Sequence, residues 1–213
     1  MSIPISITIT DPLPVIEQRV NGAIAKLTND RLTKKLNVIS NRIKSLITTW
    51  ITGQPEISSL LSRNAGSLGG MFGVVNPLTP YNDIIVAIQN SVTVRLNPFN
   101  NSLVGGLYIE IQPSDFANIL SLASGHTRYS GGDLHWLEWL LRRGDSIIIM
   151  NYSYDPVTGM GRTGLGHMVP GGSFRVPPQF SGTEKDNFIT RALSGKSQEQ
   201  AITKIIQDAL SNP

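Results

Sequence analysis

The period of the apolar positions changes several times along the chain, and each change predicts a different element. Isoleucines occupy every second position over residues 3–9, with polar residues or Pro4 between them, which is the period of a β-strand. Pro4 has no amide hydrogen to donate, so we expect this strand at the edge of a sheet. From residue 11 onwards the period of two gives way to spacings of three and four.

A long helical region is expected over residues 11–51. Asp11 is followed by proline, which is typical of an N-cap and first helical position, and Gly22 and residues 28–30 are candidate breaks into two helices. The second half carries one apolar stripe that we expect to be buried: Leu32, Leu36, Ile39, Ile43, Leu46 and Trp50. Glycine and proline then end the region, and a short helix is expected over residues 56–63.

The middle of the chain predicts a loop and then a strand pair. Residues 64–82 are rich in glycine and proline, and we expect a loop there with one short strand at 72–75. β-Branched residues predict a strand over 84–96, and the residues that follow, 97–101, have the composition of a turn. A return strand is expected over 103–111.

Helices and strands are interleaved in the remainder. We expect helices over 115–123 and 134–143, with Asp133 as the N-cap of the second. The continuous apolar run within 145–154 favours a strand that is buried on both faces, and a glycine-rich loop follows over 155–166. Short strands are expected over 167–169 and 174–176. Two closing helices, over 183–194 and 197–211, complete the chain.

This order is not a regular alternation of strand and helix, so the predicted class is α+β. We expect long amino-terminal helices packed on a small, mostly antiparallel sheet, with carboxy-terminal helices. Residues 1–213 are treated as a single domain with three parts: a helical arm (11–63), a sheet with interleaved helices (64–182) and terminal helices (183–213).

The composition favours a protein that is covered by partners. Only 15% of the residues are charged and 40% are hydrophobic, whereas about 25% charged residues is typical of soluble chains. A surface poor in charge is often buried against other subunits. The alternative is a compact monomer with a surface rich in Ser, Thr, Asn and Gln. The absence of cysteine excludes disulfides and thiolate chemistry.

Positive charge is concentrated in the helical arm. The net charge is +3 for the whole chain, but residues 15–47 hold seven basic against two acidic residues, a balance of +5. Four of these cations can share a polar face opposite the apolar stripe: Arg31, Lys34, Lys35 and Arg42. Such a face is either simply solvated, or it contacts nucleic acid or an acidic partner.

Neither a signal peptide nor a membrane span is expected. The first residues lack a basic region and a long apolar core. No apolar run approaches the ~20 residues that a spanning helix needs.

Motifs of catalysis and cofactor binding are almost absent. Residues 159–164 fit G-x-G-x-x-G, but no helix is expected to begin there, as dinucleotide binding requires. The three histidines share no metal-ligand spacing, except that Glu138 lies one turn from His135. We therefore expect no catalytic residue, no cofactor and no metal. His135, beside two tryptophans, is expected at a helix surface or an interface.

Two segments suggest a family. One comprises residues 136–149, which read W-L-E-W-L-L, then G-D, then three isoleucines. The other comprises G-R-T-G-L-G-H-M at 161–168, R-V-P-P-Q-F-S-G-T at 175–183 and N-F-I-T-R-A at 187–192. Together they resemble virion proteins of tailed bacteriophages, and the order of elements is similar to that of neck and tail-completion proteins.

The resemblance implies a structural subunit rather than an enzyme. Neck proteins form rings at the head–tail junction around the DNA channel and have no catalytic residues. The expected partners are copies of the chain in a six- or twelve-fold ring, other neck or tail proteins and, non-specifically, packaged DNA, in a virion assembled in the host cytoplasm. The loop with Arg162, Thr163, His167 and Met168 is the expected interaction element. A tail terminator and an enzyme of unknown reaction are the alternatives.

Overall fold

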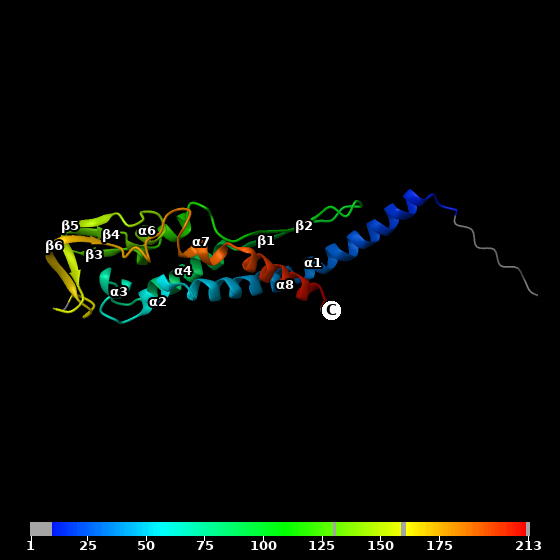
Figure 1. The fold of residues 1–213 in the computed structure, drawn as a ribbon. Helices are drawn as coiled ribbons and strands as arrows, with labels where there is room; N and C mark the ends of the chain where they lie inside the picture. The colour runs from blue at the N-terminus through cyan, green and yellow to red at the C-terminus, as the bar shows by residue number, and fades with distance from the viewer. Residues whose placement is uncertain (1–9, 130, 159–160, 212–213) are drawn as a thin grey trace, which may run out of the picture.

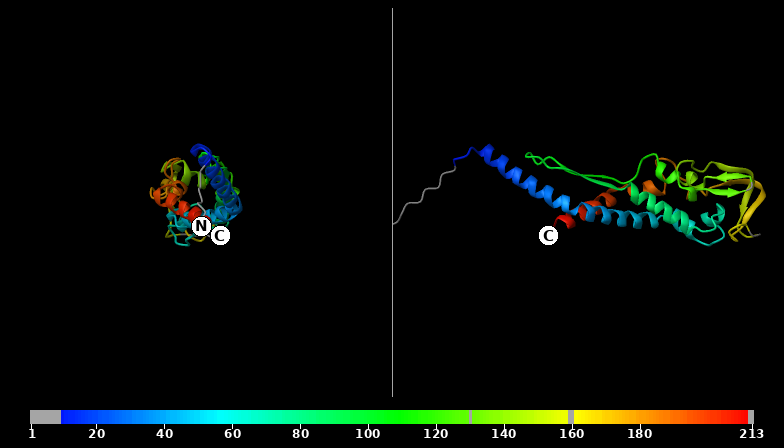
Figure 2. Two further views of the ribbon diagram at one scale, coloured as in Figure 1. Left: turned by 90° about the vertical axis from the view of Figure 1, so that its right-hand side faces the viewer. Right: turned by 180° about the vertical axis from the view of Figure 1, so that it is seen from behind.

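The protein is elongated, with one long helix projecting from a helical body (Figure 1). The computed structural model describes residues 10–129, 131–158 and 161–211. Viewed along its length the molecule is narrow (Figure 2, left). The strand expected over residues 3–9 lies outside the described residues. The described helices and antiparallel strands confirm the α+β class.

The strands form three separate antiparallel pairs rather than one sheet. Strand β1 (Thr93–Asn97) pairs with β2 (Gly106–Glu110), and β3 (Thr127–Tyr129) pairs with β4 (Gly132–Leu134). The longest pair is β5 (Ile147–Asp155) with β6 (His167–Arg175), at the end of the molecule opposite the projecting helix (Figure 1). Because β6 is continuous, the two short strands expected at 167–169 and 174–176 are one strand.

Helix α1 (Leu13–Thr52) is continuous over 40 residues, about 60 Å at 1.5 Å per residue. Neither candidate break interrupts it. The side chain of Asn29 donates to the Phe99 carbonyl at 3.0 Å and accepts from the Phe99 amide at 2.8 Å, so it holds the β1–β2 turn. Gly22 lies beneath the same turn, where a Cβ would come within 3.3 Å of Asn101 Oδ1.

The start of α1 also differs from the prediction. Pro12, not Asp11, occupies the N-cap, and no side chain caps the helix there. Asp11 instead pairs with Arg19 at 2.5 Å on the exposed side of the helix.

The apolar stripe of α1 is buried along a line that differs slightly from the expected one. Ile39, Ile43, Ile47 and Ile51 are each at most 1% exposed, while Leu36 and Leu46 are half-buried. These isoleucines are four residues apart and lie on the side of α1 against which α4, α7 and α8 pack. The prediction was thus right for Leu32, Ile39 and Ile43 and only partly right for Leu36, Leu46 and Trp50.

Helix α2 (Pro55–Leu61) confirms the short helix expected after α1. Residues 64–96, in contrast, hold more helix than expected, because α3 (Leu68–Met71) and α4 (Leu78–Ser91) occupy the segments predicted as a loop and a strand. The strand at 72–75 is not observed. In α4, Pro80, Ile84 and Ile88 are buried at spacings of four. Burial against α1 therefore outweighs the β-propensity of the branched residues.

Most of the remaining helices are shorter than expected, but the last one matches the prediction over 197–211. They are α5 (Ala117–Leu120), the 3₁₀ turn η1 (Ala123–Gly125), α6 (Trp136–Leu141), α7 (Phe188–Leu193) and α8 (Lys196–Ser211). Asp133 lies in β4 and is not an N-cap, and His135 precedes α6 instead. The prediction that 145–154 is buried on both faces was wrong, because Ile147, Met150 and Tyr152 are exposed.

Candidate functional site

One face of α1, beside its buried stripe, is apolar at its amino-terminal end and basic at its carboxy-terminal end. At about 100° per residue, nine positions from 13 to 42 fall within one arc of the helix. We call this arc the outer face: Leu13, Ile16, Val20, Ile24, Leu27, Arg31, Lys34, Val38 and Arg42. Its amino-terminal half is apolar and its carboxy-terminal half is basic.

The apolar half of the outer face is exposed to solvent, except for the half-buried Ile16. Leu13 is 78% exposed, Leu27 57% and Val20 51%. The first turns of α1, before Gly22, project past the end of the β1–β2 hairpin (Figure 2, right). Apolar side chains at spacings of three and four on a projecting helix are the pattern by which helices pair with other helices.

The basic half contains the four cations singled out in the sequence. Arg31, Lys34 and Arg42 are exposed, and Lys35 beside them is half-buried. Within the part of the chain that the structure describes, no carboxylate pairs with Arg31, Lys34 or Arg42. Their charges are therefore available to a partner. They are not opposite the buried stripe, as expected, but about a third of a turn from it.

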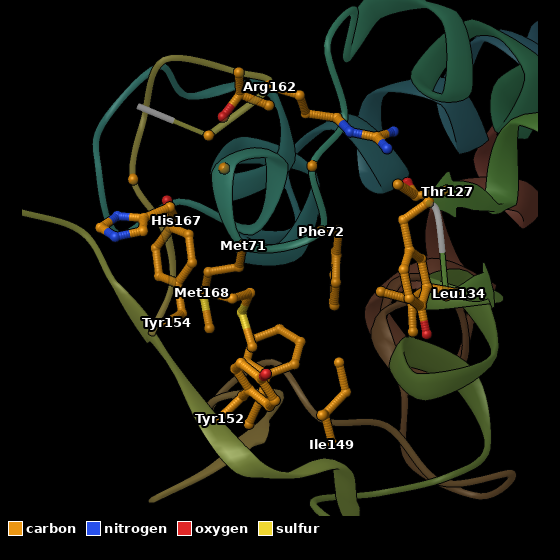
Figure 3. Close-up of a pocket in the computed structure, with 18 residues that line it drawn as sticks. Met71, Phe72, Thr127, Leu134, Ile149, Tyr152, Tyr154, Arg162, His167 and Met168 are labelled. Atoms are coloured by element: carbon orange, nitrogen blue, oxygen red, sulfur yellow. The ribbon is translucent and has the colours of Figure 1, made fainter. Parts of the chain in front are cut away.

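The second set of predicted residues gathers at the other end of the molecule. Arg162, Thr163, His167 and Met168 all line a cavity of about 610 Å³ between α3, β3 and the β5–β6 pair. Figure 3 shows Met71, Phe72 and Met168 around this cavity, with Arg162 extending toward Thr127. We call it the distal cavity. The two sets of predicted residues do not form one site, since the long axis of the molecule separates them (Figure 1).

Backbone and side-chain hydrogen bonds hold the loop between β5 and β6. The Gly161 amide donates to the Gly166 carbonyl at 2.8 Å, and the Tyr154 hydroxyl donates to the Ala65 carbonyl at 2.8 Å. Arg162 donates to the Arg128 carbonyl. A Cβ on Gly161 would come within 2.2 Å of the Gly166 oxygen, so only glycine fits there.

Two pKa shifts accompany this loop. Burial raises the pKa of the Tyr154 hydroxyl, which favours its neutral, hydrogen-bond-donating form. The hydrogen bond from the Thr158 hydroxyl lowers the pKa of Asp155 and keeps it ionised.

A third group of polar residues was not predicted. His126, Asp133 and His135 converge on one face of the β3–β4 hairpin, with their potential ligand atoms all within 4.8 Å of one another. The hairpin register, which pairs Tyr129 with Gly132, places residue 126 opposite residue 135. Because Asp133 was predicted to be a helix N-cap, it was not assigned to a strand and the hairpin was missed.

Comparisons with known proteins give no identification. No family model, no curated protein and no solved structure matches the chain. Among the described helices, none combines the length and hydropathy needed to cross a membrane.

Proposed function

We propose that this chain is a non-enzymatic structural subunit of a tailed-phage virion that forms an oligomeric ring at the head–tail junction around the DNA channel. The observation that carries the assembly part of this proposal is the exposed apolar half of the outer face of α1. The phage part rests on the sequence resemblance of residues 136–192 to virion proteins.

The occupant we assign to the apolar half is another copy of this chain. Soluble monomers rarely leave an apolar stripe of this kind open to water. A second copy would supply the same stripe, or the exposed apolar residues of the opposite end, where Met150 is 71% exposed. When the apolar half of one copy contacts the opposite end of the next copy, the same contact can repeat from copy to copy. The copies close into a ring when the rotation between neighbours allows it.

The basic half suits a channel that holds DNA. Arg31, Lys34 and Arg42 are exposed and their side chains have no carboxylate partner among the described residues. Contacts with phosphate are electrostatic and independent of base sequence, which is what a protein surrounding a moving duplex requires.

The distal cavity is the proposed docking element for other neck or tail proteins. Its lining is largely apolar and aromatic, and Arg162 and His167 supply polar groups at its edge. A tail terminator is also a ring of structural subunits, and it remains the alternative position within the virion.

Native mass spectrometry of the full chain, with images of the same sample by electron microscopy, tests the proposal. We expect a closed assembly of six or twelve copies with a central channel. A chain that stays monomeric at every concentration would overturn it. A closed ring that sits elsewhere in the purified particle would overturn only the head–tail position.

A further inference from the structure

The β3–β4 hairpin brings together two imidazoles and one carboxylate. The register pairs Thr127 with Leu134 and Arg128 with Asp133, so residues 126, 128, 133 and 135 lie on one face. His126 therefore faces His135 across the hairpin, and Asp133 lies diagonally between them. Side chains separated by several residues in the sequence become neighbours for this reason.

Two distances within this cluster are close to those between ligands of one metal ion. Oδ2 of Asp133 lies 3.2 Å from Nδ1 of His126 and 3.7 Å from Nε2 of His135. Two atoms bound to one zinc ion at about 2.0–2.2 Å with tetrahedral angles lie about 3.3–3.6 Å apart.

We propose that His126, Asp133 and His135 form a binding site for one divalent transition-metal ion, with Zn²⁺ as the ion that fits best. Neutral imidazole nitrogens and one carboxylate oxygen are a donor set that suits zinc and disfavours Mg²⁺ and Ca²⁺, which take mainly oxygen ligands. The metal site is independent of the proposed ring and of its place in a virion.

The fourth coordination position is open to water. The neighbouring Glu138 carboxylate is engaged by Arg143 at 3.1 Å, and Arg142 is engaged by Glu184 at 3.0 Å. Glu138 and Arg142 line a cavity of about 210 Å³ beside both imidazoles, which leaves room for a water ligand. Three protein ligands with one open position define the site.

The ion would join three neighbouring elements of this part of the chain. His126 directly follows η1, Asp133 lies within β4, and His135 directly precedes α6. Each strand of this hairpin has only three residues, and hairpins this short are marginally stable without further support. Metal binding would therefore stabilise the hairpin and fix it against α6.

The test uses the full chain without an affinity tag, stripped of metal by a chelator. Titration of Zn²⁺ in competition with a chromophoric chelator should show one ion per chain. Co²⁺ should give the visible absorption of a low-coordinate site. His126→Gln and His135→Gln should each weaken zinc binding at least about tenfold, and Asp133→Asn should weaken it in the same direction.

His167→Gln is the matched control, because His167 is the third histidine and lies outside the cluster. It should leave the affinity for zinc unchanged. The three ligand side chains are 23–53% exposed, so their variants are expected to fold, and circular dichroism checks this. Absence of saturable uptake by the wild-type chain, or equal affinity in folded His126→Gln and His135→Gln variants, would overturn the proposal.

Discussion

Glu56 is a carboxylate with almost no contact with water, since it is 1% exposed. It pairs with Arg191, which also binds Asp186 at 2.7 Å. Burial raises the pKa of Glu56 above its ordinary value of 4.5 despite the attraction of Arg191. The folded state thus holds this proton more tightly than the unfolded state does.

This raised pKa makes the stability of the fold depend on pH. Because the folded pKa is the higher one, Glu56 contributes stability below pH 4.5 that is lost as the pH rises through the raised folded value. We expect Glu56→Gln to remove this part of the decline, measured as urea-unfolding free energies of variant and wild type across that range. Parallel curves for the two proteins would contradict the assignment.

Asn187 is a buried cap that joins two parts of the chain. Its side chain accepts from the amides of Ile189 and Thr190 at 3.0 Å and donates to the carbonyls of Leu141 and Thr183. We expect Asn187→Ala to lower the unfolding free energy by about 2 kcal/mol, through loss of the cap and of buried hydrogen bonds. Asn37→Ala, at an exposed position of α1, should change it by less than about 0.5 kcal/mol. Equal effects of the two substitutions would refute the role of Asn187.

Residues with two local interpretations were the hardest to place from the sequence. Asn29 and Asp133 are typical of helix breaks and caps, yet the structure uses Asn29 to hold a turn 70 residues away and Asp133 to join two histidines. The role of Asn29 depends on a long-range contact, which local patterns do not encode, whereas the role of Asp133 depends on the register of a short hairpin.

At the scale of elements, strong periodicity predicted well and β-propensity predicted poorly. The long helix, the β1–β2 return strand and the two closing helices were expected and are observed. The strand expected over 84–96 is mostly helix α4, because tertiary burial of Ile84 and Ile88 decided the outcome. The sequence proposed the basic residues of α1 and the loop with Arg162 as candidates, but it could not show that the length of the molecule separates them.

The positions buried along α1 should contribute more to stability than the half-buried positions of the same helix. Ile43 is fully buried, whereas Leu46 is half-buried on the same helix. Ile43→Ala should lower the unfolding free energy by ~2–5 kcal/mol, and Leu46→Ala by clearly less, because less apolar surface and a smaller cavity are involved. Denaturant midpoints of both variants measure this. A larger effect at Leu46 would show that α1 packs along a different line.

At the scale of the whole molecule, the basic half of the outer face should bind DNA without affecting the fold. We expect the triple variant Arg31→Gln, Lys34→Gln, Arg42→Gln to keep its melting temperature, because exposed charges contribute little to stability. The salt dependence of its binding to duplex DNA should flatten, by a slope of about 0.9 for each phosphate that the variant no longer neutralises.

A matched control removes three exposed lysines from other elements: Lys185→Gln, Lys196→Gln, Lys204→Gln. This variant has the same net charge as the first, so it separates position from total charge. If both triple variants lose DNA affinity equally, the face on α1 has no special role.

The central claim is that the chain assembles through the apolar half of the outer face. Sedimentation velocity of three proteins tests it most directly: the wild type, the variant Val20→Gln, Ile24→Gln, Leu27→Gln, and the control Val75→Gln, Leu78→Gln, Val86→Gln, whose apolar residues are similarly exposed but lie outside α1. The account predicts one closed assembly for the wild type and the control, and monomers for the α1 variant. A wild type that sediments as a monomer, or an α1 variant that assembles like the wild type, would contradict it.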